Sequence, residues 1–396
     1  MNTNYDVIVA GAGPAGTSAA IHLAQHGVRV LLVEQKNFPR PKLCGEFISP
    51  ECLEHFETLG VACEMRLSGP ADITETVFYS RRGKRIIVPS RWFGGSAALG
   101  LSRAAMDDNL LRRAKVVGVN VLEDATVTDV IENESRICGI RLKTNLVEQE
   151  HHASIVVDAT GRARALARRV KNSDSRHAKR SKLVAFKAHL SDTRAPRSAC
   201  EIYSYPGGYG GLSTVESGLS NLCFIIQATD VIRAHSDPET VMRENVMQNQ
   251  RASMTLERAK IQSEWLSVSL ESFGRQRPNP TNGLLAIGDS AAFIDPFTGS
   301  GMLMALESGQ LVADVIVRQP DKSNAAQLSL DYAREYRQKF DSRLRLSGLL
   351  RRVAFRPLLA QLTISAFGTS DRLRGWLARS TRSKSDPTRA QHLLPK

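Results

Sequence analysis

The sequence predicts an α/β protein in which a Rossmann-like domain contains an inserted, β-rich (α+β) domain and is followed by a C-terminal helical tail. Three observations predict this fold. A strand, a glycine turn, a helix and a second strand occupy residues 5–34, and a strand, a glycine turn and a helix recur at residues 284–317. Short segments with strand-like alternation fill much of the chain between these two units. A chain of 396 residues is long enough for two domains.

The N-terminal unit has the spacing of a dinucleotide-binding turn. Gly11 permits the tight turn, Gly13 lets the backbone approach a pyrophosphate, and Gly16 lets the helix pack closely on the strand. The pyrophosphate then lies at the helix N-terminus, where free N–H groups and the helix dipole favour an anion. Glu34 ends the second strand and is placed to accept hydrogen bonds from ribose hydroxyls. The residues expected at the nucleotide are Gly11, Gly13, Pro14, Ala15, Gly16, Glu34 and Gln35.

The second unit offers another set of polar backbone groups. A buried strand over 284–287 ends in Gly288-Asp289, and the Asp289 carboxylate suits a ribitol or ribose hydroxyl. Gly299 and Gly301 precede a long helix, and their N–H groups suit the anionic N1–C2=O edge of a reduced flavin. Two such turns that converge on one ligand are expected for FAD and not for NAD alone. The alternative is a glycine turn in another kind of α/β protein.

A loop and two helices are expected in the first third of the chain. Two prolines keep residues 37–46 extended, and we expect this segment to cross the cofactor as a loop. Residues 50–60 predict a short helix, and Ser102 is expected to cap another helix over 103–111. Arg103 lies in the first turn of that helix, where the dipole disfavours a cation. Two interpretations remain open: a cation that reaches phosphate or flavin, or a solvated arginine.

Strand-like segments indicate the β-rich part of the fold. A polar, basic linker is expected over 171–182 and a helix over 240–250, and a buried strand ends in the turn Asp158–Gly161. The segments read as strands are 73–79, 85–88, 125–131, 137–142, 147–151, 154–157, 183–190, 199–205 and 222–227, with glycine turns between the later ones. We therefore expect an FAD-binding domain over 1–70, 97–170 and 276–335, a substrate domain over 71–96 and 171–275, and a basic helical tail over 336–396.

The net charge of +13 is concentrated near the C-terminus. Residues 341–396 carry twelve Lys and Arg side chains against three Asp and Glu. Arginines are mixed with large apolar residues over 351–359, which leaves two interpretations open: a peripheral contact with an anionic membrane, or a helix with an apolar face on the domain and a solvated basic face. No recognition motif accompanies the charge, so we expect no nucleic-acid partner.

The sequence indicates a cytoplasmic protein. It contains no run of 18 apolar residues, and its first apolar run is the Rossmann strand, without the pattern of a secretory leader. Contact with the inner face of the membrane through the basic tail is the alternative. Six cysteines are scattered without a CxxC pair, so we expect neither disulfides nor a metal site.

Taken together, these motifs resemble the FAD-dependent family that includes p-hydroxybenzoate hydroxylase, geranylgeranyl reductases and flavin-dependent halogenases. The resemblance extends from Asp6 to about Tyr336 and rests on the two glycine turns, Glu34, Arg103 and the Asp158–Gly161 turn. It implies a discontinuous Rossmann-like FAD domain with an inserted substrate domain. It also implies that Arg103, Gly288 and Asp289 bind FAD, that Val127 packs at the adenine end, and that Pro296, Gly299, Ser300, Gly301 and Met302 lie at the isoalloxazine ring.

The segment Pro39–Glu46 resembles the geranylgeranyl-reductase-like branch, where a Cys-Gly pair lies over the flavin. By this resemblance Cys44 and Gly45 contact FAD, and Cys44 delivers or relays a proton. The alternative is a small apolar residue that packs beside the ring. Pro296 is the other residue that we assign to catalysis.

Two departures from the family pattern bear on the reaction. Hydroxylases usually have an Asp-Gly pair where this chain has Asp158-Ala159-Thr160-Gly161, which puts direct docking of NAD(P)H in doubt. Halogenases usually have a Trp-x-Trp-x-Ile-Pro segment, which this sequence lacks.

The sequence therefore indicates an FAD-dependent oxidoreductase that acts on an apolar or aromatic small molecule in secondary or lipid metabolism. The leading hypothesis is a monooxygenase in which O2 forms a flavin C4a-hydroperoxide that hydroxylates the substrate. The alternative enzyme reduces a C=C bond by hydride transfer from flavin N5, with Cys44 as proton donor. A halogenase-like enzyme and a non-catalytic flavin redox carrier are further alternatives. NAD(P)H is the expected electron donor, directly or through a separate flavin reductase.

Overall fold

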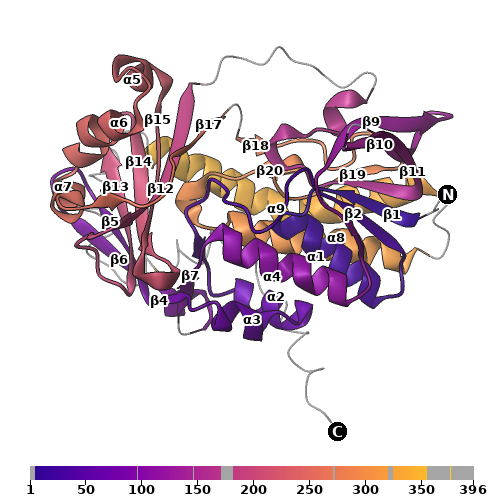
Figure 1. Cartoon of the computed structure of the whole chain (residues 1–396), viewed down its shortest axis with the longest axis horizontal. Helices are drawn as coiled ribbons and strands as arrows, with labels where there is room; N and C mark the ends of the chain where they lie inside the picture. The colour runs from indigo at the N-terminus through magenta and orange to yellow at the C-terminus, as the bar shows by residue number, and fades with distance from the viewer. Residues whose placement is uncertain are drawn as a thin grey trace, which may run out of the picture.

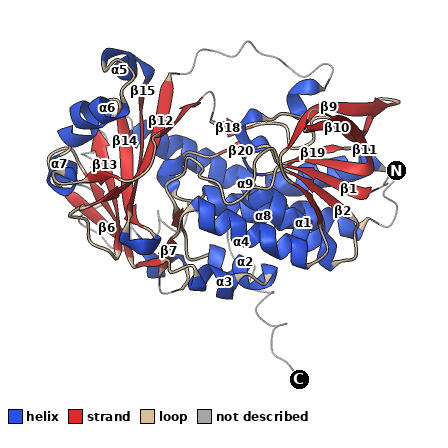
Figure 2. Ribbon diagram, in the orientation of Figure 1, coloured by secondary structure: helices blue, strands red, loops and turns tan. Residues whose placement is uncertain are grey.

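The computed structural model describes residues 5–95, 97–145, 147–170, 182–270, 273–319, 324–354 and 375 of the chain. Figure 1 shows two large sheets towards opposite ends of the molecule, with the long helices packed between and beneath them. Colouring by secondary structure separates these parts: long helices fill the middle, a sheet lies on either side of them, and short helices cover the outer side of the left-hand sheet (Figure 2). The predicted α/β class is confirmed.

The first sheet has seven strands in the order β8-β2-β1-β11-β10-β9, with β19 paired to β11. Strand β11 takes part in two kinds of pairing. Its residues 147–152 run antiparallel to β10, and its residues 153–158 run parallel to β1. The two short strands predicted here are therefore one long strand. The bounds are β1 Tyr5–Ala10, β2 Val30–Val33, β8 Asn120–Leu122, β9 Ala125–Asn133, β10 Arg136–Thr144, β11 Val147–Asp158 and β19 Leu284–Ala286.

The two helices that follow the glycine turns pack directly against each other. A Cβ on Gly309 of α8 would lie 2.5 Å from the carbonyl oxygen of Ala15 in α1, so only glycine fits this contact. The Ser18 hydroxyl of α1 donates to the carbonyl of Leu306 in α8 (3.0 Å). Segments far apart in the sequence thus lie side by side. The helices of this half are α1 Pro14–Gln25, α2 Cys52–Leu59, α3 Ala62–Leu67, α4 Arg103–Val116, α8 Gly301–Arg318 and α9 Ala325–Ala354.

The second sheet has eight strands in the order β16-β12-β15-β14-β13-β5-β6, with β17 paired to β12. On one face Phe186 and Phe224 pack with the helices α5, α6 and α7 into a core. On the opposite face Ala185 and Ile225 pack with Phe297, which lies between β19 and α8 in the chain. The bounds are β5 Glu75–Tyr79, β6 Arg85–Pro89, β12 Leu183–Ser191, β13 Ala199–Tyr205, β14 Gly208–Thr214, β15 Ser220–Gln227, β16 Lys260–Ile261, β17 Leu266–Leu270, α5 Ala228–Arg233, α6 Pro238–Asn245 and α7 Gln250–Leu256.

Strand β14 was not predicted, because its glycines indicated a turn. Residues 208–214 instead form a central strand between β13 and β15. A Cβ on Gly208 would lie 1.9 Å from the carbonyl oxygen of Ile225, and one on Gly210 would lie 2.9 Å from Cβ of Phe224. These glycines allow a close approach of neighbouring groups and do not break the strand.

Two small sheets and several short helices complete the described part of the fold. They are the sheet β3-β7-β4, with β3 Phe47–Ile48, β7 Ala98–Gly100 and β4 Ala71–Ile73, the pair β18 Gly274–Arg275 and β20 Ala292–Phe293, and the 3-10 helices η1 Ser90–Phe93, η2 Gly161–Ala163, η3 Ala167–Arg169, η4 Glu216–Gly218, η5 Val246–Gln248, η6 Gly288–Ser290 and η7 Pro296–Thr298.

Several local predictions are confirmed and one is divided. Ser102 caps α4 by accepting a hydrogen bond from the Ala105 amide (3.2 Å). Gly60 ends α2 with a φ of 70°. The helix expected over 240–250 is divided, because α6 ends at Asn245 and α7 begins at Gln250.

Other predictions concern parts of the chain outside the described residues. The expected linker lies there apart from Lys182, and the basic tail lies there beyond α9 except for residue 375. None of the helices in the described part of the chain combines the length and apolar character needed to cross a membrane. The domain boundaries remain a prediction.

Candidate active site

The N-terminal glycine turn has the shape that its sequence predicts. Gly11 has a φ of +105°, and a Cβ there would lie 2.3 Å from the carbonyl oxygen of Ala159. A Cβ on Gly16 would lie 1.8 Å from the Gly11 carbonyl oxygen. Gly13 differs, because its Cβ would meet only the Arg103 Nη2 atom, at 3.9 Å. The turn is therefore closed by Gly11 and Gly16, whereas Gly13 faces a cation and space that an anion can occupy.

Glu34 lies beside this turn, as expected from its place at the end of β2. Its Oε2 atom accepts a hydrogen bond from the Ala12 amide (2.9 Å), and its Oε1 atom accepts one from the Lys36 amide (3.1 Å). The Arg40 guanidinium lies 3.4 Å from Oε2. Strand β9 begins at the same place, because the Ala125 amide donates to the Glu34 carbonyl (2.9 Å). The start of β9, and with it Val127 two residues on, is thus near Glu34.

The second turn meets the first. A Cβ on Gly288, which has a φ of +56°, would lie 2.8 Å from Cβ of Ala15. The Gly288 amide donates to the Ser308 hydroxyl of α8 (2.9 Å). Ser290 donates to the Asp158 carboxylate (3.1 Å), which connects the Gly-Asp turn with the turn that ends β11. The structure therefore brings together the three turns that the sequence places far apart.

Four cations surround the place where these turns meet, together with the carboxylates of Asp289, of Glu34, which pairs with Arg40, and of Asp107, which pairs with Arg103 and Arg40. Burial raises the pKa of Asp289, and Arg162, Arg103 and Lys42 oppose that shift. Lys42 is an exposed residue, but the protein packed around it, followed by Arg40, Arg103 and Arg162, lowers its pKa, and Glu34 opposes that shift. Mutual repulsion among cations of this kind is relieved by a bound polyanion. The open face of Gly13 and this positive charge fit the diphosphate of FAD.

Arg103 connects this cationic region with the loop that contains Cys44. Its guanidinium makes two hydrogen bonds of 2.8 Å to the Asp107 carboxylate. Burial alone disfavours the charged guanidinium, but Asp107 and then Cys44 raise the pKa of Arg103 above its usual value. Arg103 is therefore a permanent cation with partners in the protein, and the interpretation as a merely solvated arginine is wrong.

The Cys44–Glu46 loop is held by the second sheet. Asn221 of β15 donates to the Cys44 carbonyl (3.1 Å), and Ser213 of β14 donates to the Gly45 carbonyl (3.4 Å). The Glu46 amide points to the Cys44 sulfur at 3.4 Å. A Cβ on Gly299 would lie 3.4 Å from the ring of Phe47, so the glycine turn at 299 lies next to this loop. The Cys44-Gly45 pair therefore lies between the second sheet and the glycine turn at 299.

A buried charged cluster, formed by Glu46, Lys187 and His189, lies at the same place. The Lys187 ammonium lies 2.5 Å from one Glu46 oxygen, and His189 Nε2 lies 2.7 Å from the other. The Arg103 amide donates to Glu46 as well (2.9 Å). The Glu46 side chain is 0% exposed, that of Lys187 3% and that of His189 19%. Burial opposes the charge of Glu46, yet its hydrogen bond to His189 and its proximity to Lys187 outweigh burial and lower its pKa.

None of these three residues was predicted from the sequence. One pattern indicates two of them: Lys187 and His189 are two residues apart in a strand that is otherwise apolar up to Leu190, so they project from the same face of the sheet. Glu46 lies 141 residues before Lys187, and its unusual feature, a φ of +53°, is visible only in the structure.

The other half of the same sheet face is aromatic. The Phe297 ring packs on Tyr209 at 5.3 Å between centroids and on Phe78 at 5.4 Å. Phe273 and Phe293 stack at 4.7 Å. These rings share a cluster with Ile225, Leu270 and Leu43, or adjoin it. The face can therefore contact an apolar or aromatic molecule.

A second buried carboxylate lies in this aromatic half. The Tyr209 hydroxyl donates to Asp295 Oδ1 (2.5 Å), and the Phe297 amide donates to the same atom (2.9 Å). The other oxygen, Oδ2, has no hydrogen-bond partner among the described residues. Burial raises the pKa of Asp295, and Tyr209 opposes the shift.

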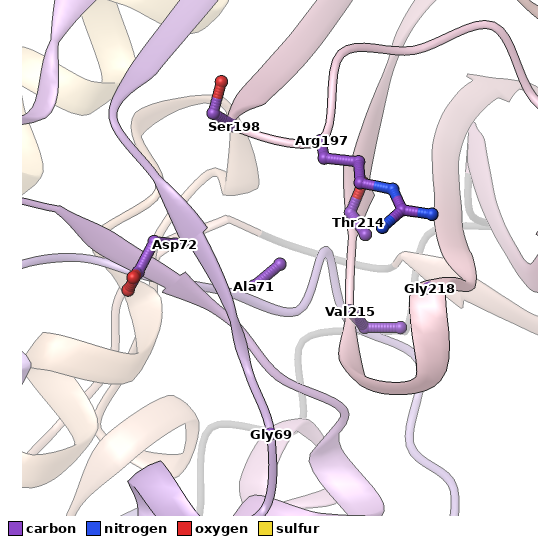
Figure 3. A pocket seen from close by; sticks show the side chains of 8 residues that line it. All are labelled: Gly69, Ala71, Asp72, Arg197, Ser198, Thr214, Val215 and Gly218. Atoms are coloured by element: carbon purple, nitrogen blue, oxygen red, sulfur yellow. The ribbon is translucent and has the colours of Figure 1, made fainter.

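A cavity of about 270 Å³ lies elsewhere, next to the small sheet β3-β7-β4. Figure 3 shows that its lining is made mostly of small residues, with the Asp72 and Arg197 side chains pointing away from each other. Asp72 forms an ion pair with Arg66 (2.6 Å). The lining residues are Gly69, Ala71, Asp72, Arg197, Ser198, Thr214, Val215 and Gly218, so neither glycine turn borders this cavity.

The remaining predicted residues fall in three places. Pro14, Ala15 and Gly16 form the first turn of α1, and Gly301 and Met302 form that of α8. Pro296 begins η7, and the Ser300 hydroxyl is bonded to that of Thr298 (2.8 Å). Gln35 is exposed just after β2, and Val127 is partly buried on β9. The roles assigned to these residues in FAD binding remain predictions.

Comparisons with known proteins agree with this geometry. A family model described as "FAD binding domain" matches residues 4–339. The chain is 27% identical to a digeranylgeranylglycerophospholipid reductase of Methanosarcina mazei, over 79% of this chain and 75% of the relative. It is 26% identical to a 1H-pyrrole-2-carbonyl-[peptidyl-carrier protein] brominase of Pseudoalteromonas luteoviolacea, over 79% and 77%.

Solved structures show the same fold. A geranylgeranyl bacteriochlorophyll reductase-like protein from Thermoplasma acidophilum superposes with a TM-score of 0.80 at 20% identity, covering 96% of this chain and 97% of that chain. A flavin-dependent brominase superposes with a TM-score of 0.76 at 23% identity, covering 95% and 94%.

Proposed function

Because the chain belongs to the FAD-binding-domain family and is an FAD-dependent oxidoreductase, we propose that it reduces a C=C bond in an apolar, isoprenoid-like molecule. The observation that carries this proposal is the setting of Cys44. Its thiol is contacted by the Glu46 amide and by Arg103, and it lies in a loop next to the glycine turn at 299.

The overall reaction would be alkene + NAD(P)H + H⁺ → alkane + NAD(P)⁺, in which one carbon of the double bond gains a hydride and the other gains a proton. Bound FAD would supply hydride transfer. The glycine turns at 11–16 and 299–301 would hold the cofactor with backbone N–H groups, and Arg40, Lys42, Arg103 and Arg162 would neutralise its diphosphate.

Cys44 would supply the proton that the second carbon of the alkene requires. A thiol proton is transferred efficiently only when a group near the sulfur can accommodate the charge left behind. Arg103 and the Glu46 amide meet that requirement. Asn221 and Ser213 would hold the loop in place through its two carbonyl groups.

The aromatic half of the sheet face would bind the apolar substrate. Tyr209, Phe297 and Phe78 are in ring contact, and Ile225 and Leu270 extend the apolar surface. Such a wall excludes water and favours a hydrocarbon chain. The relatives named digeranylgeranylglycerophospholipid reductases support an isoprenoid substrate.

A monooxygenase is the second candidate, because the same aromatic wall suits an aromatic substrate as well. Its reaction would be substrate + O2 + NAD(P)H + H⁺ → hydroxylated substrate + water + NAD(P)⁺. In this case Cys44 would have no role as proton donor, and O2 would be consumed in proportion to product.

One experiment separates the two. The FAD-loaded protein is incubated with digeranylgeranylglycerophospholipid and chemically reduced under strict anaerobiosis, and the products are weighed by mass spectrometry. We expect addition of two hydrogen atoms per double bond, a strong loss of rate in Cys44→Ala, and no change in the matched control Cys63→Ala, which alters an exposed cysteine. Turnover of an aromatic substrate that requires O2 and is insensitive to Cys44→Ala would instead support the monooxygenase.

A further inference from the structure

We propose that Glu46, Lys187 and His189 form a proton path that connects solvent with the Cys44 thiol. The proposal rests on the proposed function, because it concerns the proton that this reaction consumes. In the C=C reduction written above, one proton enters per turnover. Once Cys44 has given its proton to carbon, the thiolate must take a proton from another group before the next turnover.

The outer end of the path is His189. Its side chain is 19% exposed, whereas those of Glu46 and Lys187 are 0% and 3% exposed. An imidazole exchanges protons with water near neutral pH. His189 is also fixed in position, because its amide donates to the Ser263 hydroxyl (2.9 Å) and its Nε2 atom lies 2.7 Å from Glu46.

The inner end of the path is the pair of thiols beside Lys187. Lys187 of β12 stands opposite Cys223 of β15 in the sheet. Burial and then Cys44 raise the pKa of the Cys223 thiol, and Lys187 opposes that shift. Cys44 and Lys187 thus both lie near enough to the Cys223 thiol to act on its charge, and the Glu46 amide lies 3.4 Å from the Cys44 sulfur. A proton would move from His189 to the Glu46 carboxylate and from there, through Lys187, to the Cys44 sulfur.

The composition of the cluster argues against a purely structural ion pair. Glu46 and Lys187 already neutralise each other, so His189 is not needed for charge balance. A buried ion pair is also a poor device for stability, because an apolar pair of the same size does as well or better. The cluster further requires Glu46 to adopt a φ of +53°, which is unfavourable for a residue with a side chain. A set of groups that can pass a proton accounts for the presence of His189, which an ion pair alone does not require.

The charged and titratable groups that face the path come from each element packed on it. They are Arg103 of α4, Arg162 of η2, Cys44 of the loop, and Lys187 and Cys223 of the sheet. Arg103 keeps its charge, so it biases the cluster by a constant amount. His189 is then the member of the cluster with the most exposed side chain.

The test follows the movement of protons and not catalytic activity. The FAD-loaded full chain is reduced anaerobically and mixed in a stopped-flow instrument with digeranylgeranylglycerophospholipid in weak buffer containing phenol red. One carbon of a double bond would gain a hydride from the reduced cofactor and the other the Cys44 proton, after which the Cys44 thiolate would take up one proton from solution. Cofactor absorbance reports the electrons, and the dye reports the proton in solution.

In the unaltered protein the dye should change together with the cofactor. In His189→Gln the amide keeps a donor for Glu46 but cannot exchange a proton, so the dye should lag behind the cofactor by roughly tenfold or more. The urea midpoint of His189→Gln should stay near that of the parent. If His189 had only a structural role, a variant that shows the lag would also have a lower midpoint. The control is His151→Gln, which changes a histidine of β11 far from the cluster and should show no lag.

Addition of imidazole to His189→Gly should abolish the lag, and this variant keeps the test decisive if the glutamine perturbs folding. Equal rates of dye and cofactor in His189→Gln and His189→Gly would overturn the proton path while leaving the FAD site intact. A protein that does not bind FAD, or whose reduced cofactor is not oxidised by the alkene, would overturn the proposed function and the path together.

Discussion

Two buried carboxylates on the same face of the second sheet have opposite environments. Glu46 accepts hydrogen bonds from a lysine, a histidine and a backbone amide, and its pKa is lowered although burial opposes the charge. Asp295 accepts from one tyrosine hydroxyl and one amide, and burial raises its pKa. One site is built to hold a negative charge, and the other disfavours it.

This difference divides the sheet face into two working parts. The charged cluster beside Cys44 has water at one end and thiols at the other, which suits proton transfer. The aromatic half around Tyr209 and Phe297 has few polar partners, which suits contact with an apolar substrate. The predictions below test this division, beginning with the largest effect.

Removal of the Lys187 charge should cost the most. In Lys187→Met the Glu46 carboxylate stays buried without its cation, so the free energy of unfolding should fall by about 3–5 kcal/mol. Urea denaturation at pH 7, followed by circular dichroism, measures the change. The double variant Lys187→Met/Glu46→Gln should recover most of the loss, because no unpaired charge remains. If the single variant is as stable as the parent, Glu46 is not held as an anion by Lys187.

Loss of the tyrosine hydroxyl at Asp295 should cost less. In Tyr209→Phe the carboxyl group loses one of its two donors but keeps the Phe297 amide, so the free energy of unfolding should fall by about 1–2 kcal/mol. The matched control is Tyr205→Phe, whose hydroxyl donates to a backbone carbonyl (3.0 Å) and not to a carboxyl group. A larger fall in the free energy of unfolding in Tyr205→Phe than in Tyr209→Phe would contradict this prediction. It would show that the hydrogen bond to the Asp295 carboxyl group stabilises the protein no more than one to a backbone carbonyl.

The contributions of the two carboxylates to the free energy of unfolding should also depend on pH in opposite directions. The folded pKa of Glu46 lies below its ordinary value of 4.5, so its stabilising contribution is complete above pH 4.5 and is lost as the pH falls through the folded pKa. The folded pKa of Asp295 lies above its ordinary value of 3.8, so its contribution is complete below pH 3.8 and is lost as the pH rises through the folded pKa.

Unfolding free energies of Glu46→Gln and Asp295→Asn, each compared with the parent from pH 3 to pH 8, check this prediction. The advantage of the parent over Glu46→Gln should shrink towards acid, and its advantage over Asp295→Asn should shrink towards neutral pH. Each slope can reach about 1.4 kcal/mol per pH unit. Parallel curves for the two variants would contradict the assignment of opposite environments.

The sequence predicted the glycine turns well because their function is encoded locally. Gly11, Gly16 and Gly288 occupy positions where any Cβ would clash, and such positions show directly in the sequence. The charged cluster is different, since Glu46 and Lys187 meet only after the second sheet packs on the first half of the molecule. Strand β14 was missed for a related reason: its glycines leave room for neighbouring residues, and a single sequence does not show which residues these are.

The smallest effect is expected for an ion pair that lies outside the divided face. Arg66 and Asp72 are separated by 2.6 Å, as close as the buried pair, but their side chains are 49% and 61% exposed. Water already solvates both charges, so Arg66→Ala should change the free energy of unfolding by about 0–1 kcal/mol, and added salt should remove even that difference. The same urea titration as for Lys187→Met makes the comparison direct. If Arg66→Ala and Lys187→Met lower the free energy of unfolding equally, burial is not the reason that the Glu46 cluster is costly to break. The division of the sheet face into two environments would then be wrong as well.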